Sequence, residues 1–132
     1  MSWTITKEFH FSAAHILHGL PDDHPCGRLH GHNYIARIEL HADSLDKTGF
    51  VFDYRAFDPF KKWIDDTLDH RNLNHVMPDT YTNPTAELIG HWLHREFLSM
   101  VKLPPGIAVS VAISETPKTW STYRFDSAEV AK

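Results

Sequence analysis

Two histidines one residue apart, His30 and His32, lie in a short stretch that also contains Cys26, the only cysteine of the chain. On a β-strand, residues i and i+2 project from the same face, so these two imidazoles can bind one ion from one side. Imidazole nitrogen is a preferred ligand of zinc and of neighbouring divalent metals. Residues 26–32 therefore offer two metal ligands and one thiol.

The pair needs a third ligand before it predicts a metal site. The chain has 11 histidines among 132 residues, so about one His-x-His pair is expected by chance. His15 is the candidate, because it ends a segment, residues 3–15, whose alternation predicts a half-buried strand. The apolar face of this segment contains Trp3, Ile5, Phe9, Phe11 and Ala13, and His15 continues that face.

The neighbouring elements predict that the three histidines meet. Residues 16–29 contain several Gly, Pro and Asp residues, which favours a loop, and residues 30–41 predict a second strand. In that strand the two histidines share a face with Tyr34, Ala36, Ile38 and Leu40. If the two strands pair as an antiparallel hairpin, His15 meets His30 and His32 on the buried face. Three imidazoles with a vacant fourth position are typical of a catalytic zinc site.

Cys26 leaves two interpretations open. As a fourth ligand, its thiol would close a structural Cys-His-His-His site. As a free thiol, it could join Asp69 and His70, just past a predicted helix, in a Cys/His/Asp proton-transfer set. Glu115 is a further candidate, because a carboxylate near the end of an apolar strand usually has a partner or a ligand. The alternatives are a polar pair that ends a helix and a charge that ends a strand.

Residues 54–68 predict a first helix, because their apolar residues recur at helical spacing. Pro59 fits only the first turn of a helix, so either Asp53 or Asp58 is expected to cap it. The polar residues 69–74 are expected to follow as a loop.

A second helix is predicted to begin after Asn83, with Pro84 in its first position and an apolar stripe that reaches Phe97. Three further residues of this helix, Glu87, His91 and His94, share the opposite side and are interpreted as a solvated face. Strands at residues 107–115 and 119–126 complete a β-β-α-α-β-β order. This order predicts an α+β fold, with an antiparallel sheet and a helix pair on one face.

Composition limits the classes of protein that fit. A chain of 132 residues is long enough for one domain with its own core, and no linker or repeat divides residues 1–132. The net charge is −4 without a basic cluster, which disfavours nucleic acid as a partner. No apolar segment is long enough to span a membrane, and no signal peptide is expected. A single cysteine cannot form an internal disulfide, which suits a reducing cytoplasm.

Together these pieces resemble the 6-pyruvoyl-tetrahydropterin synthase family, and more narrowly its bacterial branch, the 6-carboxy-tetrahydropterin synthases of queuosine biosynthesis. The likeness rests on residues 11–15, 26–33, 48–53, 68–74, 83–85 and 115–116, whose order and spacing match over nearly the whole chain. Pro59 and the Thr119-Trp120 pair depart from the pattern and put the local shape in doubt more than the chemistry.

The resemblance implies a tunnelling fold (T-fold), whose subunits assemble into a ring, expected as a hexamer of two trimers with active sites between subunits. It implies zinc bound by three histidines and a catalytic base that is not a ligand. It also implies that the pair after the first helix works with the base, in this subunit or a neighbour. The implied ligands are His15, His30 and His32, the catalytic residues Cys26, Asp69 and His70, and the pterin-binding residues Glu115 and Thr85.

The spacing Cys-x3-His-x-His resembles the carboxy-forming branch, since the pyruvoyl-forming synthases of animals have a longer gap. That branch converts 7,8-dihydroneopterin triphosphate to 6-carboxy-5,6,7,8-tetrahydropterin, with release of acetaldehyde and triphosphate. A pyruvoyl-forming synthase and a non-catalytic protein with a structural zinc site stay as alternatives. Arg28 is a candidate for binding the triphosphate by its charge and position.

Overall fold

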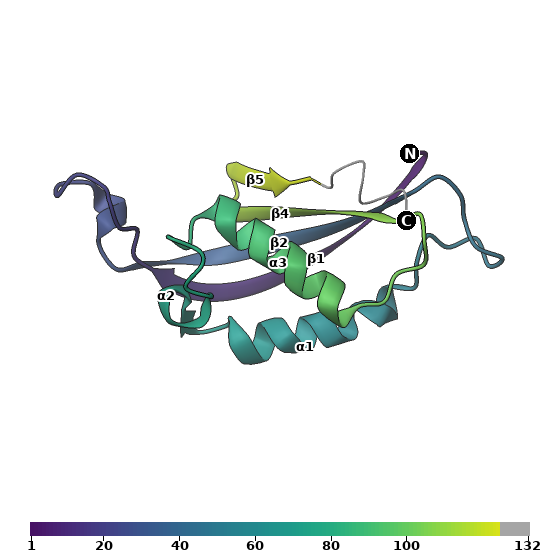
Figure 1. Cartoon of the computed structure of the whole chain (residues 1–132), viewed down its shortest axis with the longest axis horizontal. Helices are drawn as coiled ribbons and strands as arrows, with labels where there is room; N and C mark the ends of the chain where they lie inside the picture. The colour runs from purple at the N-terminus through teal and green to yellow at the C-terminus, as the bar shows by residue number, and fades with distance from the viewer. Residues whose placement is uncertain (125–132) are drawn as a thin grey trace.

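The computed structural model describes residues 1–124, which form a five-stranded sheet with helices on one face (Figure 1). The strands are β1 (Trp3–His15), β2 (His30–Ala42), β3 (Arg71–Asn72), β4 (Ala108–Thr116) and β5 (Thr119–Tyr123), in the spatial order β3-β1-β2-β4-β5. The helical segments are η1 (Pro25–Gly27), η2 (Tyr54–Phe57), α1 (Asp58–Thr67), α2 (Leu73–Val76) and α3 (Ala86–Met100). The predicted α+β class is confirmed. In this part of the chain no helix has the length and apolar character to cross a membrane.

The long hairpin β1–β2 confirms the two strands predicted at the start of the chain. Its antiparallel register runs from Trp3 opposite Ala42 to His15 opposite His30. Phe9 and Phe11 of β1 are buried, as the alternation predicts. Trp3 is half exposed, so the buried face does not extend to the first residue of the strand.

The sheet is mixed, which corrects the prediction of an antiparallel sheet. Residues 71–72 form β3, which pairs in parallel with Ala13 and Ala14 of β1. The predicted polar loop after the first helix therefore contains a short strand and then α2. The Asn72 side chain caps α2 by accepting a hydrogen bond from the Asn74 backbone N–H at 2.9 Å. These two short elements hold the segment after α1 against the edge of β1.

Both long helices begin slightly later than predicted. Asp53 caps the 3₁₀ turn η2, and α1 follows at Asp58 with Pro59 in its first turn. Of the two predicted caps, Asp53 caps the 3₁₀ turn that precedes α1, and the alternative that Asp58 caps the helix is wrong, because Asp58 is the first residue of α1 and no side chain caps that helix. In α3 the cap is Thr85, whose hydroxyl accepts from the Leu88 backbone N–H at 3.1 Å. The prediction that Pro84 occupies the first helical position is therefore wrong.

Aromatic rings fill the space between the helices and the sheet. Phe60 of α1 meets Phe9 and Phe97 edge-on, with ring centroids 5.2 Å apart in both pairs. On the helix-free face, the Arg37 guanidinium binds Glu8 at 2.9 Å and lies 4.2 Å from the centre of the Trp120 ring. Trp120 thus packs against Arg37 on that face. The predicted last strand is confirmed for residues 119–123, and its end at 125–126 lies outside the described residues.

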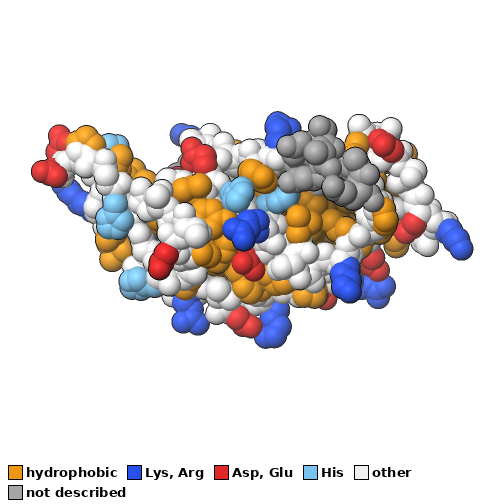
Figure 2. All heavy atoms as spheres, in the orientation of Figure 1, with side chains coloured by type: hydrophobic (Ala, Val, Ile, Leu, Met, Phe, Trp, Pro, Cys, Tyr) orange, Lys and Arg blue, Asp and Glu red, His pale blue; other side chains and the backbone are white. Residues whose placement is uncertain are grey.

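The interpretation of the polar side of α3 as fully solvated is wrong for His94. This side chain is only 4% exposed, and its ring packs 4.9 Å from the Tyr123 ring. The ring of His91 packs against the same tyrosine, with ring centroids 4.8 Å apart. Its Nδ1 atom shares a 2.8 Å hydrogen bond with the Tyr81 hydroxyl. Glu87 is exposed, as expected. On the side of the molecule that α3 covers, described side chains of both charge signs are interspersed with apolar ones (Figure 2).

Candidate metal centre and active site

Three histidine rings converge at the end of the β1–β2 hairpin. His15 pairs directly with His30, and His32 lies one step further along β2, opposite Ala13. The ring centroids are 4.5 to 5.1 Å apart. One ring nitrogen of each residue lies within 4.8 Å of the other two, and the Nε2 atoms of His15 and His30 are 3.0 Å apart. Among the described residues, this cluster is the set of three that can hold a metal ion, and it is the set that the sequence predicted.

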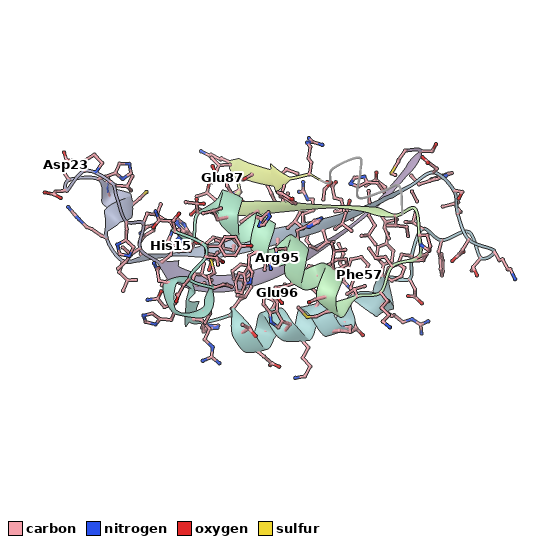
Figure 3. All side chains as sticks on the ribbon, in the orientation of Figure 1. His15, Asp23, Phe57, Glu87, Arg95 and Glu96 are labelled. Carbon is pink, nitrogen blue, oxygen red and sulfur yellow. The ribbon has the colours of Figure 1, made fainter. Side chains whose placement is uncertain are left out.

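Backbone carbonyls fix the orientation of two of these rings. The carbonyl oxygen of Pro84 accepts a hydrogen bond from His15 Nδ1 at 2.7 Å, and that of Arg28 accepts from His30 Nδ1 at 2.6 Å. Because a carbonyl can only accept, each Nδ1 carries the proton and each Nε2 directs its lone pair to the centre of the cluster. Ligand histidines in metalloproteins are oriented by this kind of bond. His15 lies near the N-terminal end of α3, whose first turn contains Glu87 (Figure 3).

Burial keeps the imidazoles in the form that binds metals. His15 is fully buried, and this desolvation lowers its pKa below the ordinary value, an effect that exceeds the opposing influence of Glu115. Desolvation also lowers the pKa of His32. Both rings are therefore neutral near pH 7, as metal ligation requires. Burial raises the pKa of the Tyr34 phenol, whose oxygen lies 3.2 Å from His15 Nδ1 as a second acceptor.

Glu115 lies against the cluster. Its Oε2 is 3.3 Å from Nε2 of His15 and 3.3 Å from Nε2 of His32. The carboxylate also borders a cavity of about 330 Å³ between the first turn of α3 and the β4–β5 hairpin, which Glu87 and Trp120 line as well. The prediction that this acid has a partner is therefore confirmed, and the partners are two of the candidate ligands.

Cys26 is a free, half-buried cysteine in η1, within the loop between β1 and β2. Its carbonyl accepts from the Leu17 backbone N–H at 3.1 Å, and its own N–H donates to His24 Nδ1 at 3.1 Å. Among the described residues, the ligand atoms within 4.8 Å of one another belong to three imidazoles and include no thiol. The geometry of the chain therefore does not form the closed Cys-His-His-His site.

Two asparagine side chains hold this loop in place. The Asn74 amide accepts from the Ile16 N–H at 2.8 Å and donates to the Ile16 carbonyl at 3.0 Å. The Asn83 amide makes the same two bonds to His18, at 2.8 and 2.9 Å. Each amide thus pairs with the loop as a neighbouring strand would. The sequence pointed to both asparagines only through the family resemblance, without a structural reason.

Asp69 and His70 form a pair that is anchored to β1. One carboxylate oxygen of Asp69 accepts from the Ser12 backbone N–H at 2.8 Å, and the other lies 3.0 Å from His70 Nδ1. The Ser12 bond is the main reason that the pKa of Asp69 is below its ordinary value. His70 has a positive φ of 60°, and its N–H donates to the Ser12 carbonyl at 2.6 Å. Two bonds to one residue therefore hold an uncommon backbone conformation.

His70 does not point toward the histidine cluster. Its side chain is 83% exposed and lines a groove of about 560 Å³ on the helix-free face of the sheet. The floor of this groove is formed by residues whose side chains alternate with the core-facing ones, Ser12, Ala14, Gly31 and Asn33. His32 borders the same groove. Within one chain, the exposed His70 therefore lines this groove together with His32, whereas His15 is fully buried on the core side of the sheet.

The sequence is similar to those of known proteins over nearly its whole length. The sequence model of the family described as 6-pyruvoyl tetrahydropterin synthase matches residues 4–126. The chain belongs to this family. A family member from Bacillus subtilis, named 6-carboxy-5,6,7,8-tetrahydropterin synthase, is 31% identical over 93% of this chain and 86% of its own length. The protein of the same name from Rickettsia felis is 31% identical over 85% of this chain and 93% of its own.

A solved structure agrees with the family assignment. The 6-pyruvoyl tetrahydropterin synthase of Caenorhabditis elegans superimposes with a TM-score of 0.78 and 29% identity, over 94% of this chain and 96% of that one. The tunnelling fold predicted from the resemblance is thus confirmed, with the mixed sheet described above. The histidine cluster consists of the three residues that the family resemblance implies as metal ligands, His15, His30 and His32.

Proposed function

We propose that this chain is a 6-carboxy-5,6,7,8-tetrahydropterin synthase of the queuosine pathway. The reaction converts 7,8-dihydroneopterin triphosphate and one water molecule to 6-carboxy-5,6,7,8-tetrahydropterin, acetaldehyde and triphosphate. The observation that carries the proposal is the cluster of three imidazoles, whose Nε2 lone pairs converge beside the carboxylate of Glu115. The names of the bacterial relatives and the Cys-x3-His-x-His spacing favour the carboxy-forming reaction.

Zinc is the proposed metal, held by His15, His30 and His32. Three neutral imidazoles suit zinc, and the arrangement leaves a position for an oxygen ligand. When bound, the ion supplies a Lewis acid that lowers the pKa of a substrate hydroxyl. The chain's contribution is to lower the pKa of His15 and His32 by burial and to orient His15 and His30 through the Pro84 and Arg28 carbonyls.

The pterin ring is proposed to lie in the cavity beside Glu115. A carboxylate can accept hydrogen bonds from the amino group and a ring N–H of a pterin. Thr85 is proposed to contact the ring as well, although its hydroxyl already accepts the capping bond of α3. Residues of the first turn of α3 and of the β4–β5 hairpin line this cavity of about 330 Å³ beside the carboxylate.

Proton transfer is assigned to Cys26, Asp69 and His70. The thiol is proposed to act as the base, and the Asp69 carboxylate orients the His70 ring, 3.0 Å away, so that it exchanges protons with the thiol. Charge on the Arg28 side chain is proposed to attract the triphosphate.

The positions of these groups support a proposal that the active sites lie between subunits. Because His70 is exposed in the helix-free groove while His15 is buried on the core side, we propose that Asp69–His70 of one subunit serves Cys26 of a neighbour. A homo-oligomer built through the uncovered face of the sheet, expected as a hexamer of two trimers, brings these groups together.

A 6-pyruvoyl-tetrahydropterin synthase is the second candidate, and the C. elegans structure favours it by name. The two activities share a site and differ in whether carbon is lost. Incubation of the zinc-loaded protein with 7,8-dihydroneopterin triphosphate separates them. Acetaldehyde with a 6-carboxy product is expected. A 6-pyruvoyl product would support the second candidate, and no turnover would contradict both.

The Cys26→Ala variant separates a catalytic thiol from a structural one. We expect zinc to stay bound at one ion per chain while turnover falls by at least about 10²-fold, the usual size of a proton-transfer contribution. His30→Ala is the matched control and is expected to lose zinc. Loss of zinc from Cys26→Ala would instead support a structural Cys-His-His-His site.

A further inference from the structure

The groove on the helix-free face of the sheet contains a permanent cation and no acidic side chain. Its volume is about 560 Å³, and the described residues that line it include Arg71, His70 and His32 but neither Asp nor Glu. The chain as a whole has 17 acidic residues against 13 basic ones, so this composition sets the groove apart. Asp69 does not line the groove, because its two oxygens bind the Ser12 N–H and His70 Nδ1. A concave surface of this kind favours an anionic ligand.

The guanidinium of Arg71 forms no ion pair within the part of the chain that the structure describes. Other cations are neutralised there, for example Arg37 by Glu8 and Lys62 by Asp66. Arg71 instead donates through Nη2 to the backbone carbonyl of Asp66 at 3.3 Å, near the end of α1. This bond anchors the side chain and leaves its charge without a counterion. The other N–H donors of the planar guanidinium are suited to the oxygens of a phosphate.

Two asparagines add hydrogen-bond donors to the same groove. The Oδ1 atom of Asn33 accepts from the Ser12 hydroxyl at 2.7 Å, and that of Asn72 accepts from the Asn74 backbone N–H at 2.9 Å. Because each oxygen already accepts a bond, the amide nitrogen is the atom that each of these groove residues can offer to an anion.

Strand pairing places Arg71 near the histidine cluster. Ala13 of β1 pairs with Arg71 of β3 on one side and with His32 of β2 on the other. Arg71 and His32 are therefore two strand spacings apart, about 10 Å between their backbones. His32 belongs to the cluster and also borders the groove. The groove thus lies between the proposed metal centre and an arginine without a counterion.

We propose that this groove binds the triphosphate chain of the substrate, with the Arg71 guanidinium as its principal ligand. The inference rests on the proposed function for the identity of the substrate. In 7,8-dihydroneopterin triphosphate the phosphates end a three-carbon side chain whose hydroxyls are proposed to bind the ion, so the phosphates must lie close to the metal centre. Arg71 is a cation that the register of the sheet places there. Arg28, the candidate from the sequence, does not line this groove, so Arg71 is a separate contact.

Binding of inorganic triphosphate tests the proposal without turnover. The zinc-loaded protein is titrated by isothermal titration calorimetry, and Arg71→Gln is compared with Arg95→Gln, which removes the same charge from an exposed position of α3 (Figure 3). We expect Arg71→Gln to weaken binding by about 10- to 100-fold, the usual effect of losing hydrogen bonds from a charged group, and Arg95→Gln to change it by less than about twofold. Phosphate-free 7,8-dihydroneopterin should bind Arg71→Gln as it binds the wild type, since the pterin ring is assigned to the cavity beside Glu115.

Triphosphate affinity of Arg71→Gln within about twofold of wild type would overturn the proposal, as would a wild-type dissociation constant above about 1 mM. Equal weakening of triphosphate and dihydroneopterin binding would also count against it. A zinc-bound ion can itself attract phosphate, so His30→Ala is titrated as well. Loss of triphosphate binding in that variant, together with full binding by Arg71→Gln, would assign the chain to the ion instead of the groove.

Urea denaturation identifies a folding defect in Arg71→Gln. In that case Arg71→Lys replaces it, because lysine keeps the charge but not the planar fork. We expect this variant to weaken triphosphate binding by about 3- to 10-fold, and an unchanged affinity would overturn the role of the guanidinium. Triphosphate binding that depends on Arg71 in a protein without turnover would contradict the proposed reaction and leave the groove's role intact.

Discussion

Asn74 and Ile16 are joined by two hydrogen bonds, in which a side-chain amide imitates the edge of a β-strand. Asn83 repeats the arrangement at His18, so two residues that are far away in sequence hold the beginning of the Cys26 loop. The two amides thus tie the beginning of the loop that carries Cys26 to residues 74 and 83.

Replacement of Asn74 by Ala is expected to make Cys26 more reactive. Loss of two hydrogen bonds to the loop costs about 1–3 kcal/mol of local order, so the thiol should be modified about 5- to 150-fold faster. The measurement is the rate of reaction with a disulfide reagent under native conditions. Thr4→Val removes a hydrogen bond to His41, near the other end of the same hairpin, and serves as the control. Equal rates in all three proteins would show that the clamp does not position the thiol.

Two substitutions of Asp69 should separate anchoring from proton transfer. Asn keeps an oxygen that can accept from the Ser12 N–H, whereas Ala leaves that partly buried donor without its partner. We expect Asp69→Ala to lower the free energy of unfolding by about 1–3 kcal/mol and Asp69→Asn to lower it by less than about 1 kcal/mol. Both should reduce turnover. Urea denaturation alongside the activity assay checks this, and equal stability of the two variants would argue against the anchoring role.

Gly90→Ala is expected to stabilise the protein. Gly90 lies inside α3, and a Cβ there would meet the Ile113 side chain at 3.5 Å, an ordinary contact distance. Alanine is favoured over glycine in a helix by about 0.8–1.0 kcal/mol, so the free energy of unfolding should rise by about 0.5–1 kcal/mol. Chemical denaturation measures the change. A lower midpoint would mean that the helix cannot tolerate the added methyl against β4.

The metal-free protein should lose stability in mild acid. Burial lowers the pKa of His15 and His32 below the ordinary value of 6.5, so below that value the unfolded chain binds more protons than the folded one. Their contribution to stability is complete above pH 6.5 and declines as the pH falls through the folded-state pKa values. The urea midpoint with chelator present should thus fall between about pH 7.5 and pH 5, and less so in His32→Gln. If the urea midpoints of the variant and the wild type fell equally with pH, His32 would not contribute to this loss of stability.

Excess zinc should raise the melting temperature, because only the folded chain brings the three imidazoles together. At a free zinc concentration of about 100 times the dissociation constant, binding adds about 2.7 kcal/mol to the free energy of unfolding. Differential scanning calorimetry with zinc or with chelator measures this, and His30→Ala should show no difference between the two conditions. A zinc effect retained by that variant would place the ion elsewhere.

The metal ligands were predictable because strand alternation assigns a side of the sheet to every residue. Once His15 ends one strand and His30 begins the next, a hairpin must bring them together. The strand β3 was not predictable, because it has only two residues and an alternation of apolar and polar side chains cannot be recognised over so short a segment. The start of α3 was ambiguous, since Pro84 and Thr85 both favour a helix start and only the hydroxyl bond to Leu88 decides between them.

Other features of the site could not be predicted from the types and spacing of the side chains. The orientation of two imidazoles depends on the carbonyls of Pro84 and Arg28, and every residue has a carbonyl. His94 is buried by Tyr123, a partner from the far end of the chain that no local pattern of α3 indicates. Burial of a polar side chain by a distant strand is a tertiary effect, so amphipathic spacing alone assigned the residue to the surface.

The pairing of His15 with His30 as the last rung of the hairpin has a consequence for how this protein can change. A residue inserted within either strand would turn the following side chains to the other side and separate the three ligands. Insertions between residues 16 and 29 leave that rung in place. Variation in the length of the thiol-bearing loop can therefore move Cys26 while the three imidazoles keep their places.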